Sequence, residues 1–99
     1  MPFRFKVSDY KVMGGKLVRV RMIEENGTVK SVQISGDFFL VPEDSLPQLE
    51  KVLKGATLEA SEVKNLVNHF FETRHTQMLG VSSGDIVHAL LLAKEEVIA

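Results

Sequence analysis

The histidine and glutamate residues of one predicted helix are the first candidates for chemistry in this 99-residue sequence. His69, Glu72 and His75 follow one another at intervals of three residues. Each interval falls about 60° short of a full helical turn, so the three side chains fan over about 120° of the helix surface. Side chains of a single helix can bind the same metal ion only when they lie close together on one face of that helix, and this fan is too wide for such a compact site. We therefore expect solvated side chains here and no metal site, and we expect His88 to lie at the boundary of a core.

Glycine and lysine come together near the N-terminus, at Gly14, Gly15 and Lys16. This triplet is too short for a phosphate loop of the form Gly-x-x-x-x-Gly-Lys-Ser/Thr, and it leads into a predicted strand instead of a helix. The serines lack a Gly-x-Ser-x-Gly elbow. Cysteine is absent, which excludes thiolate nucleophiles, disulfides and Cys-ligated zinc or iron–sulfur sites. These residues by themselves assemble no complete active site.

The segment Ser35-Gly36-Asp37-Phe38-Phe39 joins a predicted strand-rich half to a helix-rich half. Neighbouring side chains of a strand point to opposite faces, so Phe38 and Phe39 cannot lie on the same side of a sheet. One ring is expected in the core, and the other under a helix, against a partner or in water. Gly36 permits a bend or a close approach, and Asp37 can accept backbone N–H groups in a turn. The segment is either a strand end that turns a corner or a functional contact.

Alternating patterns predict the strands that position these motifs. Residues 3–7 form one strand, whose apolar face carries Phe3, Phe5 and Val7. Residues 16–35 form an antiparallel hairpin around Asn26-Gly27, because both central positions of a type I′ turn need positive φ. One face of the hairpin is apolar, with Val18, Val20, Met22, Val32 and Ile34, and the opposite face carries Arg19 and Arg21. Residues 38–41 continue this strand past a bulge or form a short strand of their own.

Helical periodicity follows Pro42. We predict a first helix from a capping box, Ser45-x-x-Gln48, up to Gly55. A second helix covers residues 61–75, residues 77–81 form a loop, and a third helix opens at Ser82-x-x-Asp85 and carries apolar residues as far as Val97. Strands followed by helices indicate an α+β fold: an antiparallel sheet with about three helices packed on one face. We expect one domain over residues 1–99, with Arg19 and Arg21 on the uncovered face.

Charge is unevenly distributed along a chain of net charge −1. Residues 1–22 hold six lysines and arginines and a single acid, Asp9. This half could meet an acidic partner, a phosphate or nucleic acid; the commoner alternative is a solvated strand face. The sequence has no apolar run long enough for a membrane helix and no signal-peptide pattern at residues 1–6, so a cytoplasmic location is the default expectation.

The order Gly14-Gly15-Lys16-Leu17-Val18, an Asn-Gly hairpin, then Ile34-Ser35-Gly36-Asp37-Phe38-Phe39 resembles a known signature. Pro42-Glu43 and Leu53-Lys54-Gly55 extend it. The resemblance covers roughly residues 10–97 and is to the small C-terminal domain of lipoate–protein ligases, which is a separate subunit in split ligases. It implies a fold related to that of iron–sulfur scaffold proteins.

The resemblance implies an accessory role. Such ligases make lipoyl-adenylate (lipoyl-AMP) from lipoate and ATP with Mg²⁺, and then transfer the lipoyl group to a lysine of an acyl-carrier domain of the E2 or H-protein type. The motifs that bind lipoate and nucleotide belong to the large catalytic subunit, and the Arg-Arg-x-x-Gly-Gly-Gly run among them is absent here. We therefore expect no cofactor bound by this chain alone, no catalytic residue of its own, and activity only in a heterodimer.

Two site hypotheses follow from the resemblance. In the first, Gly14, Gly15 and Lys16 approach the adenylate or triphosphate held by the large subunit; the alternative is a solvated lysine. In the second, Gly36, Asp37 and one of Phe38 and Phe39 contact the large subunit; the alternative is core packing. Both require residues 14–16 and 36–39 to share a surface. The rival function is a free-standing binding module, for RNA or protein, that uses the Arg19 and Arg21 face, although the hairpin's polar face lacks the aromatic side chains that stack on bases.

Overall fold

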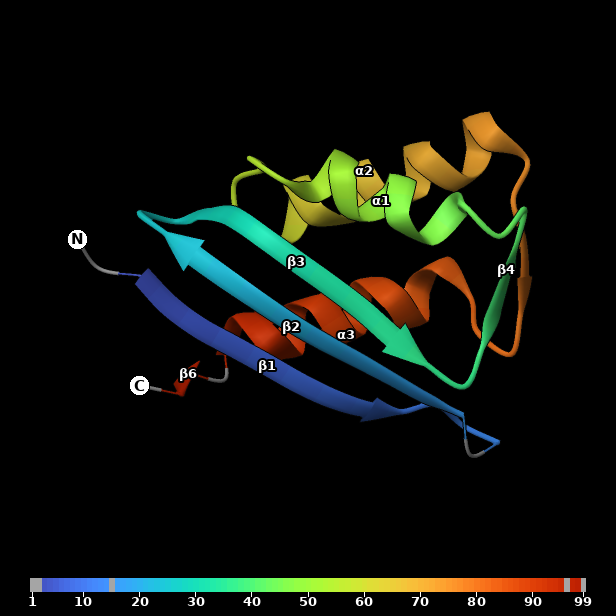
Figure 1. Cartoon of the computed structure of the whole chain (residues 1–99), viewed down its shortest axis with the longest axis horizontal. Helices are drawn as coiled ribbons and strands as arrows, with labels where there is room; N and C mark the ends of the chain where they lie inside the picture. Colours follow the sequence, from blue (N-terminus) through green and yellow to red (C-terminus); the bar gives the residue numbers. More distant parts are fainter. Residues whose placement is uncertain (1–2, 15, 96, 99) are drawn as a thin grey trace.

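The computed structural model describes residues 3–14, 16–95 and 97–98. The elements in chain order are β1 (Phe3–Lys11), β2 (Leu17–Glu25), β3 (Thr28–Gly36), β4 (Phe39–Val41), α1 (Ser45–Leu53), α2 (Ala60–Arg74), β5 (Gln77–Leu79), α3 (Ser83–Glu95) and β6 (Val97–Ile98). Strands β3, β2, β1 and β6 form an antiparallel main sheet in that order, while β4 and β5 pair as a separate two-stranded ribbon (Figure 1). The prediction of an α+β fold is confirmed.

The β2–β3 hairpin turns at the predicted dipeptide. Asn26 and Gly27 have φ values of 53° and 81°, as a type I′ turn requires, and Glu25 pairs with Thr28 on either side. The two strands of the hairpin cover residues 17–25 and 28–36, so the hairpin begins and ends one position later than predicted. A shift in register at Ile23/Glu24 inserts an extra residue in β3. Because of this bulge, Val29 reaches the same buried face as Ile34.

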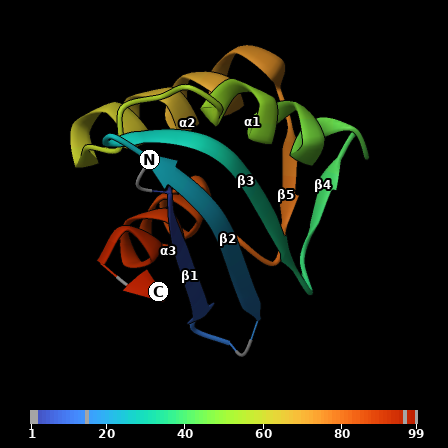
Figure 2. The same cartoon turned by 60° about the vertical axis from the view of Figure 1, so that its left-hand side comes forward.

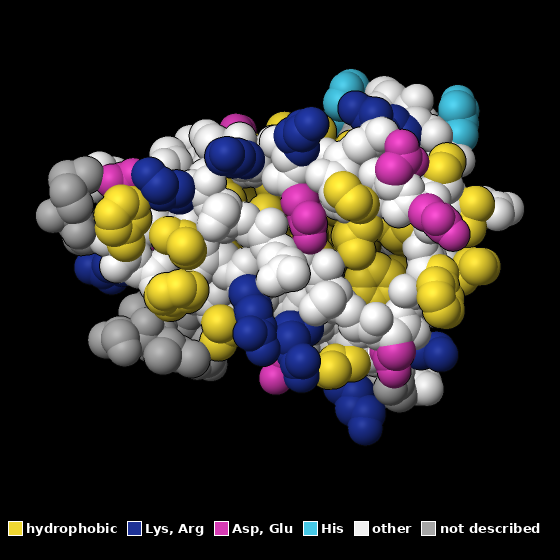
Figure 3. Space-filling model, viewed as in Figure 1, with side chains coloured by type: hydrophobic (Ala, Val, Ile, Leu, Met, Phe, Trp, Pro, Cys, Tyr) yellow, Lys and Arg dark blue, Asp and Glu magenta, His cyan; other side chains and the backbone are white. Residues whose placement is uncertain are grey.

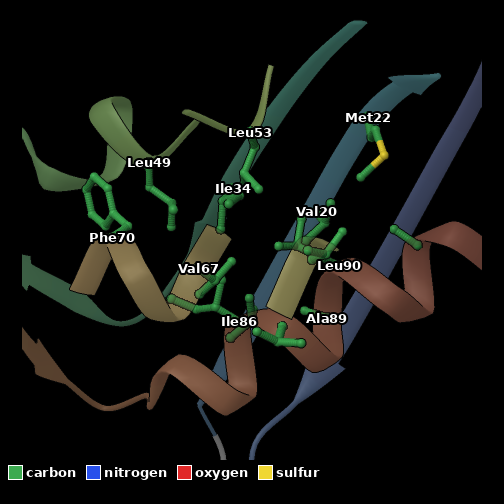
Figure 4. Close-up of a cluster of buried hydrophobic side chains, with 14 of the residues drawn as sticks. Val20, Met22, Ile34, Leu49, Leu53, Val67, Phe70, Ile86, Ala89 and Leu90 are labelled. Carbon is green, nitrogen blue, oxygen red and sulfur yellow. The ribbon is translucent and has the colours of Figure 1, made fainter. Parts of the chain in front are cut away.

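The core lies between the main sheet and the helices (Figure 4). It is formed by apolar side chains from the inner face of the sheet and from all three helices, including Val20, Met22, Ile34, Leu49, Leu53, Val67, Phe70, Ile86 and Leu90. Full burial of such a side chain is worth about 1.5–3 kcal/mol relative to leaving it exposed. The hydrophobic stripes that predicted the helices are therefore the stripes that hold them on the sheet.

The helices cover one side of the main sheet. Helix α3 packs against β1 and β2, α1 packs against β3, and α2 packs against α1 and α3 (Figures 1 and 2). The predicted capping box opens α3: the N–H of Ser82 donates to the Asp85 carboxylate at 2.9 Å, and the N–H of Asp85 donates to the Ser82 hydroxyl at 3.2 Å. Arg19 and Arg21 alternate along β2 with buried apolar residues, so they lie on the opposite face of the sheet, as predicted.

Strand β1 turns the polar side chains of Lys6 and Ser8 toward α3. The Lys6 ammonium donates a 2.7 Å hydrogen bond to the carbonyl oxygen of Lys94 at the end of α3, and the Ser8 hydroxyl donates one of 2.7 Å to the carbonyl oxygen of Ala89. Both side chains are buried. The apolar face formed by Phe3, Phe5 and Val7 consequently lies on the open side of the sheet, where Phe3 and Phe5 are 51% and 58% exposed.

Three local predictions were wrong. Helix α1 begins at Ser45 without a side-chain cap: Asp44 precedes it, and the Gln48 amide donates to the Asp44 carboxylate at 2.8 Å. Residues 77–79 form β5 instead of a loop, because they pair with β4. Val97 lies outside α3, in β6, where it pairs with Lys6. Within the described part of the chain, no helix is both long and apolar enough to cross a membrane.

Candidate functional site

The glycine–lysine motif and the Gly36–Phe39 motif meet at one corner of the main sheet. Val18 pairs with Gly36 at the end of the β2–β3 ladder. Just beyond it, the backbone N–H of Leu17 donates a hydrogen bond of 2.6 Å to the carboxylate of Asp37, and the N–H of Asp37 donates one of 3.3 Å to the carbonyl oxygen of Leu17. Lys16 is therefore held beside Asp37, although the two are far apart in the sequence.

Only glycine fits at position 36 of this corner, because there is no room for a side chain. The φ of Gly36 is +154°, and a Cβ atom built there would collide with the carbonyl oxygen of Leu17 and would lie 2.9 Å from a ring carbon of Phe38. The close approach lets the chain leave the main sheet immediately after β3. Phe38 then turns into the core, and β4 starts in a new direction.

Asp37 is ionised over the ordinary pH range. The hydrogen bond from the N–H of Leu17 is the main cause that lowers the pKa of this carboxyl below its usual value. The backbone N–H of Asp37 itself and the positive charges of Lys16 and Lys11 lower the pKa further. A carboxylate is stabilised by donors aimed at it and by nearby cations. The corner thus combines one fixed negative charge with the positive charge of Lys16.

Lys16 lies against the loop that follows the ribbon. Gly80 has a φ of +93°, and a Cβ atom built on it would come within 3.4 Å of Cγ and 3.5 Å of Cε of Lys16, and within 3.5 Å of Cβ of Phe38. The aliphatic part of Lys16 therefore packs over Gly80 while the residue stays exposed. This arrangement places an ammonium group where the main sheet and the ribbon adjoin.

The two phenylalanines separate as strand geometry predicts. Phe38 is 7% exposed and belongs to the core, whereas Phe39 is 69% exposed. On β4 and β5, Phe39 pairs with Leu79, and Val41 lies two positions further along the same face of β4. We call Phe39, Val41 and Leu79 the ribbon patch; all three are exposed. Hydrophobic side chains gather over the ribbon at the right-hand side of Figure 3.

Sequence reasoning missed Val41 and Leu79 as site residues. The signal for β5 is weak, since it consists of three residues, with Met78 turned inward and Gly80 directly after Leu79. Such a short segment cannot be told from a loop by periodicity. Its pairing with β4 is what brings Leu79 beside Phe39.

The β1–β2 loop leads into the same corner. The N–H of Val12 donates to the carbonyl oxygen of Lys16 at 2.6 Å and closes the loop. Met13 is 97% exposed, and Gly14 has a φ of +100° with open space around its Cα. Gly15 lies outside the described residues. Lys16 is therefore the member of the predicted triplet whose side-chain surroundings the structure defines.

The remaining candidates stay dispersed. His69, Glu72 and His75 are exposed on or just after α2, and within the described ranges no three His, Asp or Glu side chains are placed to hold a metal ion. His88 is exposed and its ring centroid lies 4.4 Å from that of Tyr10. The corner thus supplies a cation, a backbone-bound carboxylate and an apolar ribbon, a combination suited to binding and to stabilising charge.

Comparison with known proteins identifies the family to which this arrangement belongs. Residues 2–90 match the family model of the bacterial lipoate protein ligase C-terminus. The chain is 34% identical to lipoate-protein ligase A subunit 2 of Thermoplasma acidophilum over 74 residues, which cover 75% of this chain and 76% of that protein.

A solved structure gives the same result. The fold is similar to that of a chain from an archaeal lipoylation system of Thermoplasma acidophilum, with a TM-score of 0.80 and 28% sequence identity. That system consists of a bipartite lipoate protein ligase and its E2 lipoyl domain. The similarity covers 90% of this chain and 97% of that one. The protein therefore belongs to the family of lipoate–protein ligase C-terminal domains, in the form in which that domain is the small subunit of a bipartite ligase.

Proposed function

We propose that this chain forms a heterodimer with a large catalytic ligase subunit and is required there for ATP-dependent formation of lipoyl-adenylate. The complex then lipoylates an acyl-carrier domain of the E2 or H-protein type. ATP, Mg²⁺ and lipoate are bound in the complex and mainly by the large subunit. The similarity to a bipartite ligase that was studied together with its E2 lipoyl domain supports this assignment.

The observation that carries the proposal is the position of the ribbon patch next to Lys16. Phe39, Val41 and Leu79 offer an apolar surface on paired strands, and exposed aromatic residues of this kind tend to dominate the free energy of protein association. The ribbon is joined directly to the corner through Phe38 and Gly80. A subunit that covers the ribbon patch would bring its own bound ligand near the ammonium of Lys16.

Lys16 would act by electrostatics. Adenylate formation moves negative charge onto the departing pyrophosphate, and a cation held at that place stabilises the charge as it develops. A small domain that closes over the nucleotide also excludes water and limits hydrolysis of the adenylate. The hydrogen bond from the N–H of Leu17 to the Asp37 carboxylate fixes the backbone of the corner. The packing of the Lys16 side chain over Gly80 limits the positions available to its ammonium group.

A reconstitution experiment tests this proposal. The chain and a large ligase subunit are purified separately, mixed with lipoate, ATP and Mg²⁺, and assayed for lipoyl-adenylate and for co-purification. We expect the adenylate only in the mixture. Phe39→Ala should abolish co-purification without changing the circular dichroism spectrum. Phe5→Ala is the matched control, because it removes an exposed ring at the opposite end of the molecule; this variant should still co-purify with the large subunit. Adenylate formation by this chain alone would contradict the proposal.

The alternative function, a free-standing nucleic-acid module, gains one observation from the structure. The hairpin's polar face lacks aromatic side chains, but β1 adds Phe3 and Phe5 to the same open face as Arg19 and Arg21. Aromatic and basic side chains on an open sheet are a known mode of RNA binding. Binding of labelled single-stranded RNA by the isolated chain, with strong salt dependence, would favour this alternative.

Two further expectations stay predictions. One is that the fold is related to that of iron–sulfur scaffold proteins; this chain has no cysteine to ligate a cluster. The other is a cytoplasmic location.

A further inference from the structure

The open face of the main sheet carries a second exposed apolar surface. Phe3 and Phe5 are each more than half exposed, and Phe5 pairs with Ile23 on β2, whose side chain lies on the same face. Arg21 follows the same alternation on β2. We call Phe5, Ile23 and Arg21, with Phe3 beside them, the sheet patch. Figure 3 shows this face: hydrophobic side chains (yellow) gather at the left, and Lys and Arg side chains (dark blue) lie nearer the centre.

The sheet patch borders a hollow in the open face. Phe5, Arg21 and Ile23 line it together with Ser31 and Gln33 of β3, and its volume is about 370 Å³. The lining side chains come from paired strands, whose register fixes their spacing. Beside the sheet patch, the Lys30 ammonium lies 4.9 Å from the centre of the Phe3 ring. The hollow combines apolar walls with amide, hydroxyl and guanidinium donors, which suits the side chains of a protein surface.

Charge on this face is opposite in sign to the net charge of the chain. Its cations are Lys11, Arg19, Arg21 and Lys30, and its acids are Asp9 and Glu25. Arg19 pairs with Asp9 at 2.7 Å and Lys30 with Glu25 at 3.6 Å. Among the described residues, Lys11 and Arg21 take part in neither ion pair. The face is therefore positive on a molecule of net charge −1, and it complements an acidic partner surface.

The sheet patch and the ribbon patch lie at opposite ends of the molecule. Strand β1 runs from Phe3, beside Glu25, to Lys11, beside Leu17, and its eight steps span about 26 Å at ~3.3 Å per residue. The ribbon adjoins the Leu17 end (Figures 1 and 2). A large subunit that covers the ribbon patch can leave the sheet patch free for a second protein.

We propose that the sheet patch binds the acyl-carrier domain that accepts the lipoyl group, through an acidic and partly apolar surface of that domain. This inference rests on the proposed ligase function, in which the acceptor is the second protein that must approach the complex. A docking face remote from the ribbon lets the acceptor arrive without disturbing the subunit interface. Nucleic acid fits less well, because Asp9 and Glu25 neutralise two of the four cations and repel phosphate.

The test uses the reconstituted two-subunit ligase with an E2 lipoyl domain as the acceptor. Transfer is measured against acceptor concentration for Arg21→Glu and Phe5→Ala. The control Lys64→Glu makes the same charge change on exposed α2. We expect the acceptor KM to rise about tenfold or more in both patch variants, with lipoyl-adenylate formation and kcat near the wild-type values. Raising the salt from about 0.05 M to about 0.5 M should raise the wild-type KM more steeply than that of Arg21→Glu.

The possible outcomes separate the two levels of the proposal. A wild-type mixture that makes no lipoyl-adenylate contradicts the ligase function itself. An active mixture in which Arg21→Glu and Phe5→Ala keep the wild-type KM overturns the docking face alone, as does an equal rise in KM for Lys64→Glu. Loss of RNA binding in Arg21→Glu with an unchanged KM would assign the face to nucleic acid instead. If Arg21→Glu alters the circular dichroism spectrum, Arg21→Gln takes its place.

Discussion

The backbone N–H of Leu17 and the carboxylate of Asp37 are joined by a hydrogen bond of 2.6 Å at the end of the β2–β3 ladder. A second bond returns from the N–H of Asp37 to the carbonyl oxygen of Leu17. Together they close the corner from which both the ribbon and the side chain of Lys16 project. The geometry of the candidate site therefore depends on a contact between two residues that are 20 positions apart.

Removing the charge of Asp37 should destabilise the fold in a pH-dependent way. The folded-state pKa is lowered, chiefly by the Leu17 N–H, so the carboxylate contributes stability above the unfolded-state pKa of about 3.9. That contribution is lost as the pH falls through the lower folded-state pKa. We expect wild type to melt at a higher temperature than Asp37→Asn near neutral pH, with a difference that narrows below about pH 4. Thermal melts across this range test it; a constant difference would contradict it.

Substituting Gly36 should cost far more than substituting Gly14. A Cβ atom at Gly36 meets the Leu17 carbonyl oxygen and the Phe38 ring, whereas one at Gly14 has nothing within 4 Å. We expect Gly36→Ala to lower the free energy of unfolding by about 3 kcal/mol or more through collision and strain. Gly14→Ala, at a φ of +100°, should cost about 1–2 kcal/mol through backbone strain alone. Urea denaturation of both variants measures the difference, and equal losses would argue against the close approach.

The two neighbouring rings should behave oppositely in the isolated chain. Phe38→Ala removes a core side chain and should lower the free energy of unfolding by about 3–5 kcal/mol. Phe39→Ala should change it by no more than about 0.5 kcal/mol, because that ring is largely exposed. Denaturant titration of the unpaired chain measures both. A large loss for Phe39→Ala would show that the ribbon supports the fold, and would make co-purification a poor measure of its contacts.

Loss of the Lys16 ammonium should slow one half-reaction. If it faces the phosphates in the complex, Lys16→Ala should reduce lipoyl-adenylate formation by about tenfold to a hundredfold and leave transfer from premade lipoyl-adenylate intact. Lys16→Arg keeps the charge and should retain more of the adenylation rate. Single-turnover assays of the two steps separate these effects. Equal losses in both steps would point instead to a misplaced or unfolded subunit.

The hairpin was predictable because its determinants are local. Asn26-Gly27 favours the type I′ turn by its backbone preference, and strict alternation from Val18 to Met22 assigns the inner face. The capping box of α3 was predictable for the same reason, since Ser82 and Asp85 satisfy each other's N–H groups within one turn. The separation of Phe38 and Phe39 also followed from local geometry, but which ring is buried did not.

The orientation of β1 was not predictable from its pattern. Phe3, Phe5 and Val7 alternate as a core face would, yet α3 offers backbone carbonyl oxygens that satisfy Lys6 and Ser8 on the other face. A buried polar side chain is tolerated when it finds such a partner, and that partner lies more than 80 residues away. The exposed rings of the open face, and with them the sheet patch, follow from this choice.

By itself the sequence determined the strand-then-helix order, the hairpin with its turn, and the resemblance to a ligase domain, because turns, caps and periodic patterns act over a few residues. The tertiary structure alone decided that Lys16 packs beside Gly80, that Leu79 joins Phe39 in one patch, and that Phe3 and Phe5 face outward. Each of these depends on strand pairing or helix docking between distant segments, whose register is set by the packing of the whole core.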